Sequence, residues 1–201
     1  MPPSAACRFA LGRPGGETAL SMSRIRITGG AWRSRLIQVV DGPGLRPTPD
    51  RVRETLFNWL GQDLNGLDCL DLFAGSGILG FEAASRGAAS VVLVEHSPAA
   101  LAALRKNAEI LGGDGVAVVR ADALEFAAST GRQDRRFDLV FLDPPYRQGW
   151  LERLWPLLPA LVAPNGRLYV ESEAPVVPPA PWTLVRNGKA GQVFYHLLER
   201  E

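Results

Sequence analysis

The stretch Asp68–Gly80, DCLDLFAGSGILG, decides the fold, because a short apolar strand pattern runs into a glycine-rich turn and then into an apolar helical pattern. The same alternation continues to residue 143. Apolar strands that alternate with helices need crossover connections, and these build a parallel sheet covered on both faces. The sequence therefore predicts a doubly wound α/β domain. We expect strands at 68–73, 90–95, 116–121 and 137–143, and helices at 78–87, 97–111 and 123–129.

The C-terminal part follows a different pattern. Pro156 and Pro159 interrupt a helical segment, and the strand pattern RLYVES follows at 167–172. Two further strand patterns, 183–187 and 192–199, are separated only by GKAG. A connection this short joins antiparallel strands, so the sheet is expected to end in an antiparallel pair.

The N-terminal part predicts a basic arm. Strand patterns at 24–28 and 36–40 flank a glycine turn, which indicates a β-hairpin. A helix is expected at 49–61, with Thr48 as its N-cap and Pro49 in its first turn. Two arginines of this helix are expected to lie outside its apolar stripe. The stripe consists of Val52, Leu56, Trp59 and Leu60, and the arginines are Arg51 and Arg53.

Charge is concentrated in this arm, although the whole chain of 201 residues carries only +1. Residues 24–53 hold seven arginines against two aspartates. Arginine pairs with phosphate oxygens, so the arm is a candidate phosphate-facing, nucleic-acid-binding surface, and a merely solvated arm is the alternative. The candidate RNA-binding residues are Arg24, Arg26, Arg33, Arg35, Arg51 and Arg53; Arg46 also belongs to the basic segment.

The hydrophobic content and the number of cysteines indicate how many domains the chain forms and in which cellular compartment it is expected. A hydrophobic content of 46% suits one domain, with residues 49–201 as its body and 22–48 as arm and linker. Cys7 and Cys69 cannot form a disulfide framework, which favours a reducing, cytoplasmic location. No apolar run is long enough to span a membrane. Residues 1–21 are expected to be a disordered extension, and Met22 is a hypothetical native start.

The glycine turn predicts a nucleoside site. Gly75, Gly77 and Gly80 follow a strand and open a helix, and Glu95 ends the next strand. Such glycines admit a ligand close to the backbone, and the acid can accept from ribose hydroxyls. A ligand-free turn is the alternative, and the pattern does not separate NAD from S-adenosylmethionine. Asp122 follows the third strand, where it can accept from an adenine amine, cap the next helix, or do both.

The stretch LDPPY predicts chemistry at the same edge of the sheet. Asp143 and the carbonyl of Pro144 can accept the two N–H bonds of an exocyclic amine, while Tyr146 offers a ring face to a base. Accepting these hydrogens returns electron density to the nitrogen, which then attacks a sulfonium methyl without a metal. An ordinary proline turn is the alternative.

These motifs together resemble the RsmD family of bacterial methyltransferases that act on guanine N2 of 16S ribosomal RNA. The resemblance is carried by RITGGAWRSR, GLRPTPDRVRETLFNWL, LDLFAGSGILGFEAASRGA, FDLVFLDPPY, LYVESE and GQVFY, between about Arg24 and Glu199. It implies a Rossmann-like class I methyltransferase fold. The expected sheet has seven mostly parallel strands and an antiparallel last strand, with the N-terminal hairpin added.

The resemblance also implies a donor, a substrate and site residues. The donor is S-adenosylmethionine, and the substrate is 16S rRNA in an assembling or assembled small subunit, bound by a monomer. The implied donor-site positions are Asp71, Ala74, Gly75, Ser76, Gly77, Glu95, Asp122 and Ala123, and the implied catalytic positions are Asp143, Pro144 and Tyr146.

Other functions remain open from the residues alone. A DNA adenine or protein glutamine methyltransferase could use the same acceptors. An NAD-dependent oxidoreductase would need a proton-transferring group, and we expect His96 and His196 to serve packing or surface hydrogen bonds instead. A noncatalytic RNA-binding module would need neither Glu95 nor DPPY. A guanine substrate would have to be unpaired or extruded before its N2 amine is reached.

Overall fold

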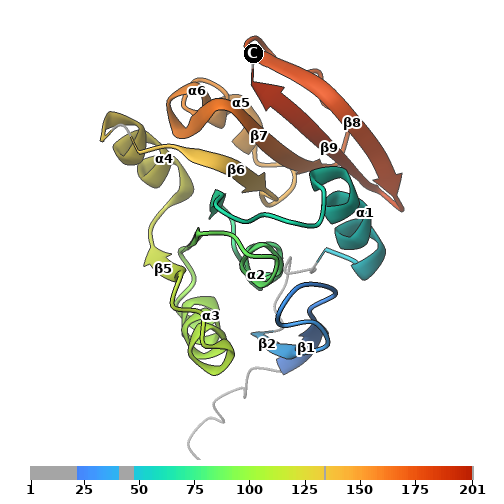
Figure 1. Cartoon of the computed structure of the whole chain (residues 1–201). Coiled ribbons are helices and arrows are strands. Elements are labelled where there is room, and N and C mark those ends of the chain that lie inside the picture. Colours follow the sequence, from blue (N-terminus) through green and yellow to red (C-terminus); the bar gives the residue numbers. More distant parts are fainter. Residues whose placement is uncertain (1–21, 41–47, 134, 201) are drawn as a thin grey trace, which may run out of the picture.

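A computed structural model of the chain describes residues 22–40, 48–133 and 135–200. The expected extension 1–21, with Cys7, and the linker segment 41–47, with Arg46, lie outside the described residues. The main sheet has seven strands in the order β5-β4-β3-β6-β7-β9-β8 (Figure 1). A separate two-stranded sheet is formed by β1 and β2.

The main sheet is parallel from β5 to β7, and β9 runs antiparallel between β7 and β8. The predicted sheet with an antiparallel last strand is thus confirmed. Its strands are β3 Asp68–Asp71, β4 Ser90–Glu95, β5 Val116–Arg120, β6 Phe137–Leu142, β7 Val162–Ser172, β8 Trp182–Ala190 and β9 Val193–Arg200. The helices are α1 Asp50–Leu60, α2 Ile78–Ser85, α3 Pro98–Leu111, α4 Ala123–Arg132, α5 Trp150–Leu154 and α6 Leu158–Leu161.

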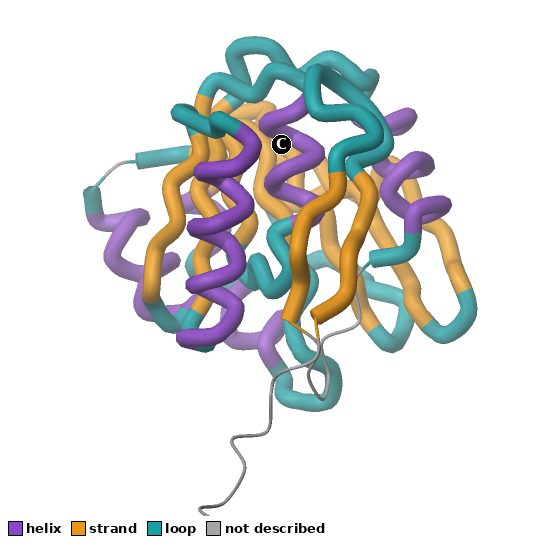
Figure 2. Tube along the Cα trace, turned by 90° about the horizontal axis from the view of Figure 1, so that it is seen from below, coloured by secondary structure: helices purple, strands orange, loops and turns teal. Residues whose placement is uncertain are grey.

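Helices cover both faces of the sheet (Figures 1 and 2). Alternate residues along each strand enter two separate apolar cores, as the period of two in a strand requires. On β6, Phe141 packs into the core shared with α1, α2 and α3, whereas Val140 packs into the core with α4, α5 and α6. Cys69 is buried in the first core, as expected for a small apolar residue.

The hairpin consists of β1 Met22–Arg26 and β2 Leu36–Val40, paired antiparallel. It packs beside α2 and α3 (Figure 1), and its Ile37 and Val39 belong to the same core as those helices. Asn107 of α3 exchanges two hydrogen bonds with the backbone of Gln38. The arm is therefore held by both apolar burial and polar contacts to the domain.

The start of α1 differs from the prediction. Pro49 occupies the N-cap position and forms no side-chain capping bond, and the helix begins at Asp50. The Thr48 hydroxyl instead donates to Glu171, 123 residues further along the chain, at 3.0 Å. A sequence pattern cannot anticipate this choice, because capping and tertiary hydrogen bonds compete for the same hydroxyl.

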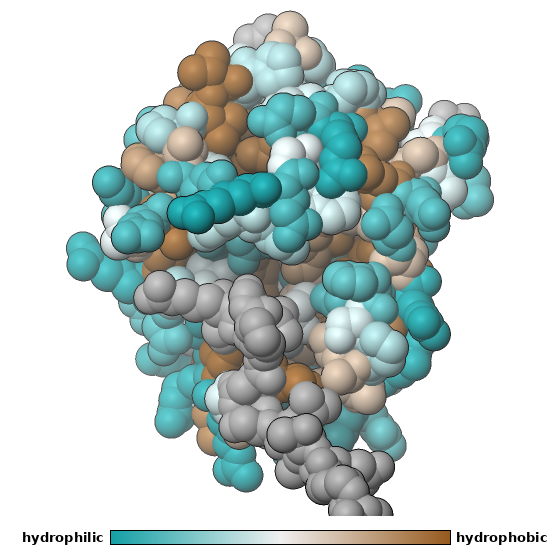
Figure 3. All heavy atoms as spheres, turned by 180° about the vertical axis from the view of Figure 1, so that it is seen from behind, coloured by the Kyte–Doolittle hydropathy of each residue, from teal (hydrophilic) through white to brown (hydrophobic). Residues whose placement is uncertain are grey.

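Hydrophilic residues occupy much of the face in Figure 3, with apolar areas between them. Among the described residues, no helix combines the length and the apolar character needed to cross a membrane.

Candidate active site

The glycine-rich turn joins β3 to α2 at the carboxyl edge of the sheet, where β4, β5, β6 and β7 also end. Ala74 donates its N–H to the Val94 carbonyl at 2.9 Å, which ties the turn to the neighbouring strand. The hydroxyl of Ser76 accepts from the N–H of Ile78 at 3.3 Å. Gly75 adopts φ +50°, a backbone conformation that favours glycine. The turn is thus preformed by its own hydrogen bonds.

Glu95 lies across from this turn at the end of β4. Its carboxylate accepts from the N–H groups of Gly75, His96 and Ser97 at 2.9, 2.8 and 2.7 Å. Oε1 takes the N–H groups of His96 and Ser97 and lies 3.3 Å from Nδ1 of His96, whereas Oε2 takes only that of Gly75 and so retains an acceptor position for a ligand hydroxyl. The Glu95 side chain is almost buried, and these three donors fix its orientation.

The other two glycines of the motif have a packing reason. A Cβ on Gly77 would lie 2.4 Å from Leu104 of α3, and one on Gly80 would lie 2.2 Å from Leu93 of β4. Both glycines therefore let α2 approach its neighbours closely, which is one of the roles of glycines in such turns. Gly75, by contrast, is only partly buried.

Asp122 caps α4, as one of its two interpretations predicted. Its Oδ1 accepts from the N–H of Leu124 at 2.8 Å and of Glu125 at 3.1 Å. Ala123 begins the helix and is buried in the second core. Because capping uses one oxygen, the second oxygen of Asp122 is available to a ligand at the edge of the sheet.

The DPPY residues follow β6, which lies next to β3 as expected. Asp143 is partly buried, Pro144 is buried, and the Tyr146 ring is 41% exposed. This loop and the segment after β7 line a cavity of about 280 Å³, together with Trp150 and Trp155. The lining combines Pro144, the rings of Tyr146, Trp150 and Trp155, and the acid Glu171, which suits a planar base, while Asp143 directly precedes the lining residue Pro144.

Three carboxyl groups, two buried and one partly buried, lie close enough at this edge to affect one another, and we name Asp71, Asp143 and Glu171 the carboxylate cluster. Burial, with smaller contributions from nearby Glu95 and Glu171, raises the pKa of Asp71 from 3.8 to about 7. Burial, Glu171 and Asp71 together hold the pKa of Asp143 well above its usual value. Burial likewise raises the pKa of Glu171. Among the described residues, no Lys, Arg or His forms an ion pair with any member of the cluster.

Glu171 is a candidate site residue that the sequence interpretation missed. Its Oε1 accepts from the hydroxyls of Tyr169 at 2.8 Å and Thr48 at 3.0 Å. The signal in the sequence is its place at the end of the apolar strand RLYVES, where an acid reaches the same edge as Asp143. His196, by contrast, is buried beside Val170 and Val176, and burial lowers its pKa, so it serves packing as expected.

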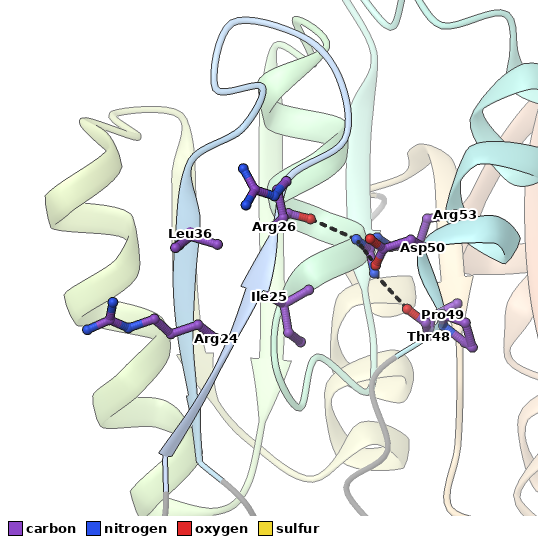
Figure 4. A pocket seen from close by; sticks show the side chains of 8 residues that line it. All are labelled: Arg24, Ile25, Arg26, Leu36, Thr48, Pro49, Asp50 and Arg53. Atoms are coloured by element: carbon purple, nitrogen blue, oxygen red, sulfur yellow. Dashed lines mark hydrogen bonds and ion pairs between the residues drawn. The ribbon is translucent and has the colours of Figure 1, made fainter.

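The prediction that Arg53 is an exposed RNA-binding residue is wrong. Arg53 is 1% exposed, so it does not lie off the buried stripe of α1. Figure 4 shows its guanidinium between two backbone carbonyls, those of Arg26 and Thr48, each at 2.7 Å. It also pairs with buried Glu82 at 3.3 Å and with Asp50 at 2.9 Å. Arg53 therefore joins the hairpin, α1 and α2, and it cannot reach a phosphate.

The other candidate arginines are exposed, and one of them, Arg35, forms hydrogen bonds within the protein. Arg35 donates to the carbonyls of Ile110 and Leu111 at 2.6 and 3.2 Å, and so caps the C-terminus of α3. Arg24 and Arg26 lie on β1, where they border a shallow hollow beside α1 (Figure 4). Arg24, Arg26, Arg33 and Arg51 have exposed side chains. Within the described ranges, no group of three or more His, Cys, Asp or Glu residues is arranged to hold a metal ion.

The comparisons with known proteins agree with this geometry. The family model described as "Conserved hypothetical protein 95" matches residues 25–199. The chain is 48% identical to "Ribosomal RNA small subunit methyltransferase D" of Escherichia coli (strain K12), over 89% of this chain and 91% of the relative. The chain belongs to this family. The resemblance found in the sequence motifs is thereby confirmed.

Solved structures place the family in the methyltransferase fold. The structure titled "Putative methyltransferase yhhF from Escherichia coli" matches with a TM-score of 0.79 and 47% identity, over 89% of this chain and 99% of that chain. A structure titled as a putative methyltransferase "complexed with SAH" matches with a TM-score of 0.71 and 17% identity, over 92% of this chain and 58% of that chain, and so shares the fold. The family and its fold favour a methyltransferase over an oxidoreductase or a noncatalytic module.

Proposed function

We propose that this protein transfers a methyl group from S-adenosylmethionine to the exocyclic N2 amine of a guanine in small-subunit ribosomal RNA. The observation that carries the proposal is Asp143, which is followed by two prolines at the edge of the sheet. In the described part of the chain, neither carboxylate oxygen of Asp143 accepts a hydrogen bond. An acid that is partly buried and has no donors is prepared for a ligand that brings its own.

The acceptor geometry suits a weakly nucleophilic amine. The lone pair of a ring-conjugated amine is delocalised into the ring. When Asp143 and the Pro144 carbonyl each accept one of its N–H bonds, the nitrogen regains density and its lone pair points out of the ring plane. Tyr146 can cover the ring of the base and fix its orientation.

Asp143 also suits the charge that develops during transfer. As the N–C bond forms and the S–C bond breaks, the amine nitrogen becomes positive, and a nearby carboxylate stabilises it. The raised pKa of Asp143 makes its carboxylate a stronger base than an exposed aspartate, so it can receive the proton that the nitrogen must lose. One proton leaves the amine for each methyl group gained.

The turn residues fit the donor. S-adenosylmethionine contains a ribose and an adenine, and it supplies the electrophilic methyl group when bound. Glu95 retains an acceptor position for a ribose hydroxyl, and Asp122 retains an oxygen for the adenine amine. We assign the donor site to Asp71, Ala74, Gly75, Ser76, Gly77, Glu95, Asp122 and Ala123, with Gly77 acting through packing.

The basic arm supports an RNA substrate. Arg24, Arg26, Arg33 and Arg51 expose guanidinium groups on the hairpin and the adjoining helix. Relatives named as small-subunit ribosomal RNA methyltransferases favour RNA over DNA adenine or a protein amide. We infer that the exposed arginines hold phosphates while the target base enters the cavity.

Tritium transfer tests the whole proposal. Purified protein and tritiated S-adenosylmethionine are incubated with small-subunit RNA, and separately with small subunits, from cells that lack the enzyme. The labelled nucleotide is then identified by mass spectrometry. We expect N2-methylguanosine at one position. Label on adenine, on protein, or on no product would overturn the proposal.

A further inference from the structure

The place of Glu171 beside Asp143 leads to an inference that rests on the proposed function. The last paired residues of β6 and β7 are Leu142 and Val170, so Asp143 and Glu171 follow them at the same level of the sheet. Residues level with one another on neighbouring parallel strands share a face. Glu171 also lines the cavity that Pro144 and Tyr146 line. Glu171 therefore borders the cavity together with the DPPY loop, and Asp143 lies level with it at the end of the neighbouring strand.

The hydroxyls around Glu171 leave one of its oxygens available. Tyr169 and Thr48 both donate to Oε1, and no described residue donates to Oε2. The only fully enclosed side-chain nitrogen or oxygen without a partner in the described ranges is Nε1 of Trp182. Oε2 of Glu171 is therefore not sealed off. Together with an oxygen of Asp143 and the Pro144 carbonyl, it makes three acceptors, and neither carboxylate oxygen among them receives a hydrogen bond from a described residue.

This set of acceptors matches the edge of one base. Guanine carries three N–H bonds side by side, two on N2 and one on N1, whereas adenine has an acceptor at N1 beside its amine. We propose that Glu171 determines base specificity by accepting the N1–H of the target guanine while Asp143 and Pro144 accept the N2 amine. A base with an acceptor at N1, such as adenine, would leave the Glu171 carboxylate without a hydrogen-bond partner. An unpaired buried acceptor costs more free energy than the mere loss of a contact, so such a base would be strongly disfavoured.

The charge distribution agrees with this arrangement. Burial raises the pKa of both acids, and the charges of Glu171 and Asp71 raise that of Asp143 further. Three N–H donors of guanine would supply the missing partners on binding. The Tyr169 and Thr48 hydroxyls hold Glu171 in place before the base arrives, so little side-chain entropy is lost.

The test compares guanine with 2-aminopurine at the target position of a small-subunit RNA made by splinted ligation. 2-Aminopurine keeps the N2 amine but has an acceptor at N1. For the wild-type protein we expect kcat/KM to be roughly ten- to a hundred-fold higher with guanine, the effect of one hydrogen bond to a charged group. For Glu171→Gln we expect this ratio to fall at least about tenfold, because the amide can donate to N1.

The control is Glu199→Gln, the same substitution far from this edge, and it should keep the wild-type ratio. A merely structural role of Glu171 would lower kcat/KM for both RNAs and leave their ratio unchanged, and that result would overturn the inference. Equal rates with both bases in the wild-type protein would overturn it without any variant. If the wild-type protein methylates neither RNA, it is the proposed function itself that fails.

Discussion

This protein has two groups of buried charged side chains, one in which a carboxylate is paired with cations and one in which the carboxylates have no cation among the described residues. Under the hairpin, Glu82 is fully buried between Arg53 and Arg86, and we name these three the ion-pair cluster. Its carboxylate also accepts from the N–H and hydroxyl of Thr28 at 2.7 and 2.8 Å. At the edge of the sheet, the carboxylate cluster has three acids and no cation among the described residues.

The difference separates structure from function. Buried charges that satisfy one another join segments that are far apart in the chain, here β1, α1 and α2. Buried carboxylates without a compensating cation cost stability, and they persist where a ligand completes them. In the ion-pair cluster, the guanidinium carbon of Arg86 also lies 4.1 Å from the centre of the Phe57 ring, so this cation packs against the apolar core.

The largest effect is expected from Asp143→Asn. It removes the carboxylate that accepts from the amine and stabilises the developing positive charge, so kcat should fall by roughly 10²- to 10⁴-fold. Binding of S-adenosylmethionine, measured by isothermal titration, should change little. Single-turnover methyl transfer is the measurement, and Asp138→Asn at the other end of β6 is the matched control. A normal rate in the Asp143 variant would remove Asp143 from the mechanism.

The next largest effect is expected from Arg53→Met. It leaves Glu82 buried with one cation fewer, and removing one partner of a buried pair costs about 3–5 kcal/mol. Urea unfolding measures the loss. Arg51→Met on the same helix removes an exposed arginine and should change stability by less than about 0.5 kcal/mol. Equal effects of the two substitutions would mean that the buried network contributes nothing to folding.

A pH-dependent effect is expected from Asp71→Asn. The pKa of Asp71 is about 7 in the folded protein against 3.8 for a free carboxyl, so the folded state holds its proton more tightly. The stability contributed by this proton is present below about pH 4 and is lost as pH rises to about 7. The asparagine variant should therefore gain stability over the wild type between these pH values, by an amount on the order of a few kcal/mol. A difference in urea midpoints that stays constant with pH would contradict this.

The smallest effect is expected from single exposed arginines. Arg24→Ala or Arg33→Ala should lower the slope of log affinity for RNA against log salt by somewhat less than one, as for one lost phosphate contact. Arg132→Ala, an exposed arginine on α4, is the control. Filter binding over a salt series is the measurement. Unchanged slopes in both hairpin variants would place the RNA elsewhere on the surface.

The sequence was informative where a local pattern carries the signal. Alternating strands and helices predicted the order of elements, because hydrophobic period depends only on neighbours in the chain. Asp122 as a helix cap was also predictable, since the capping donors lie two and three residues away. The DPPY motif indicated an edge of the sheet because it directly follows an apolar strand.

The errors arose where partners are far apart in sequence. Arg53 has the spacing of an exposed residue beside an apolar stripe, and only the packing of α2 supplies Glu82 to bury it. Thr48 has the pattern of a cap, yet its hydroxyl is used by Glu171 on β7. Glu171 itself gave a weak signal, because an acid after a strand is common.

The sequence by itself thus determined the class of fold, the family and the place of Asp143 at the end of β6, since each depends on residues close together in the chain. Only the tertiary structure decided which charges are compensated. A buried carboxyl is stable when a cation or donor lies within hydrogen-bond distance, and that distance is set by the packing of strands and helices rather than by sequence spacing.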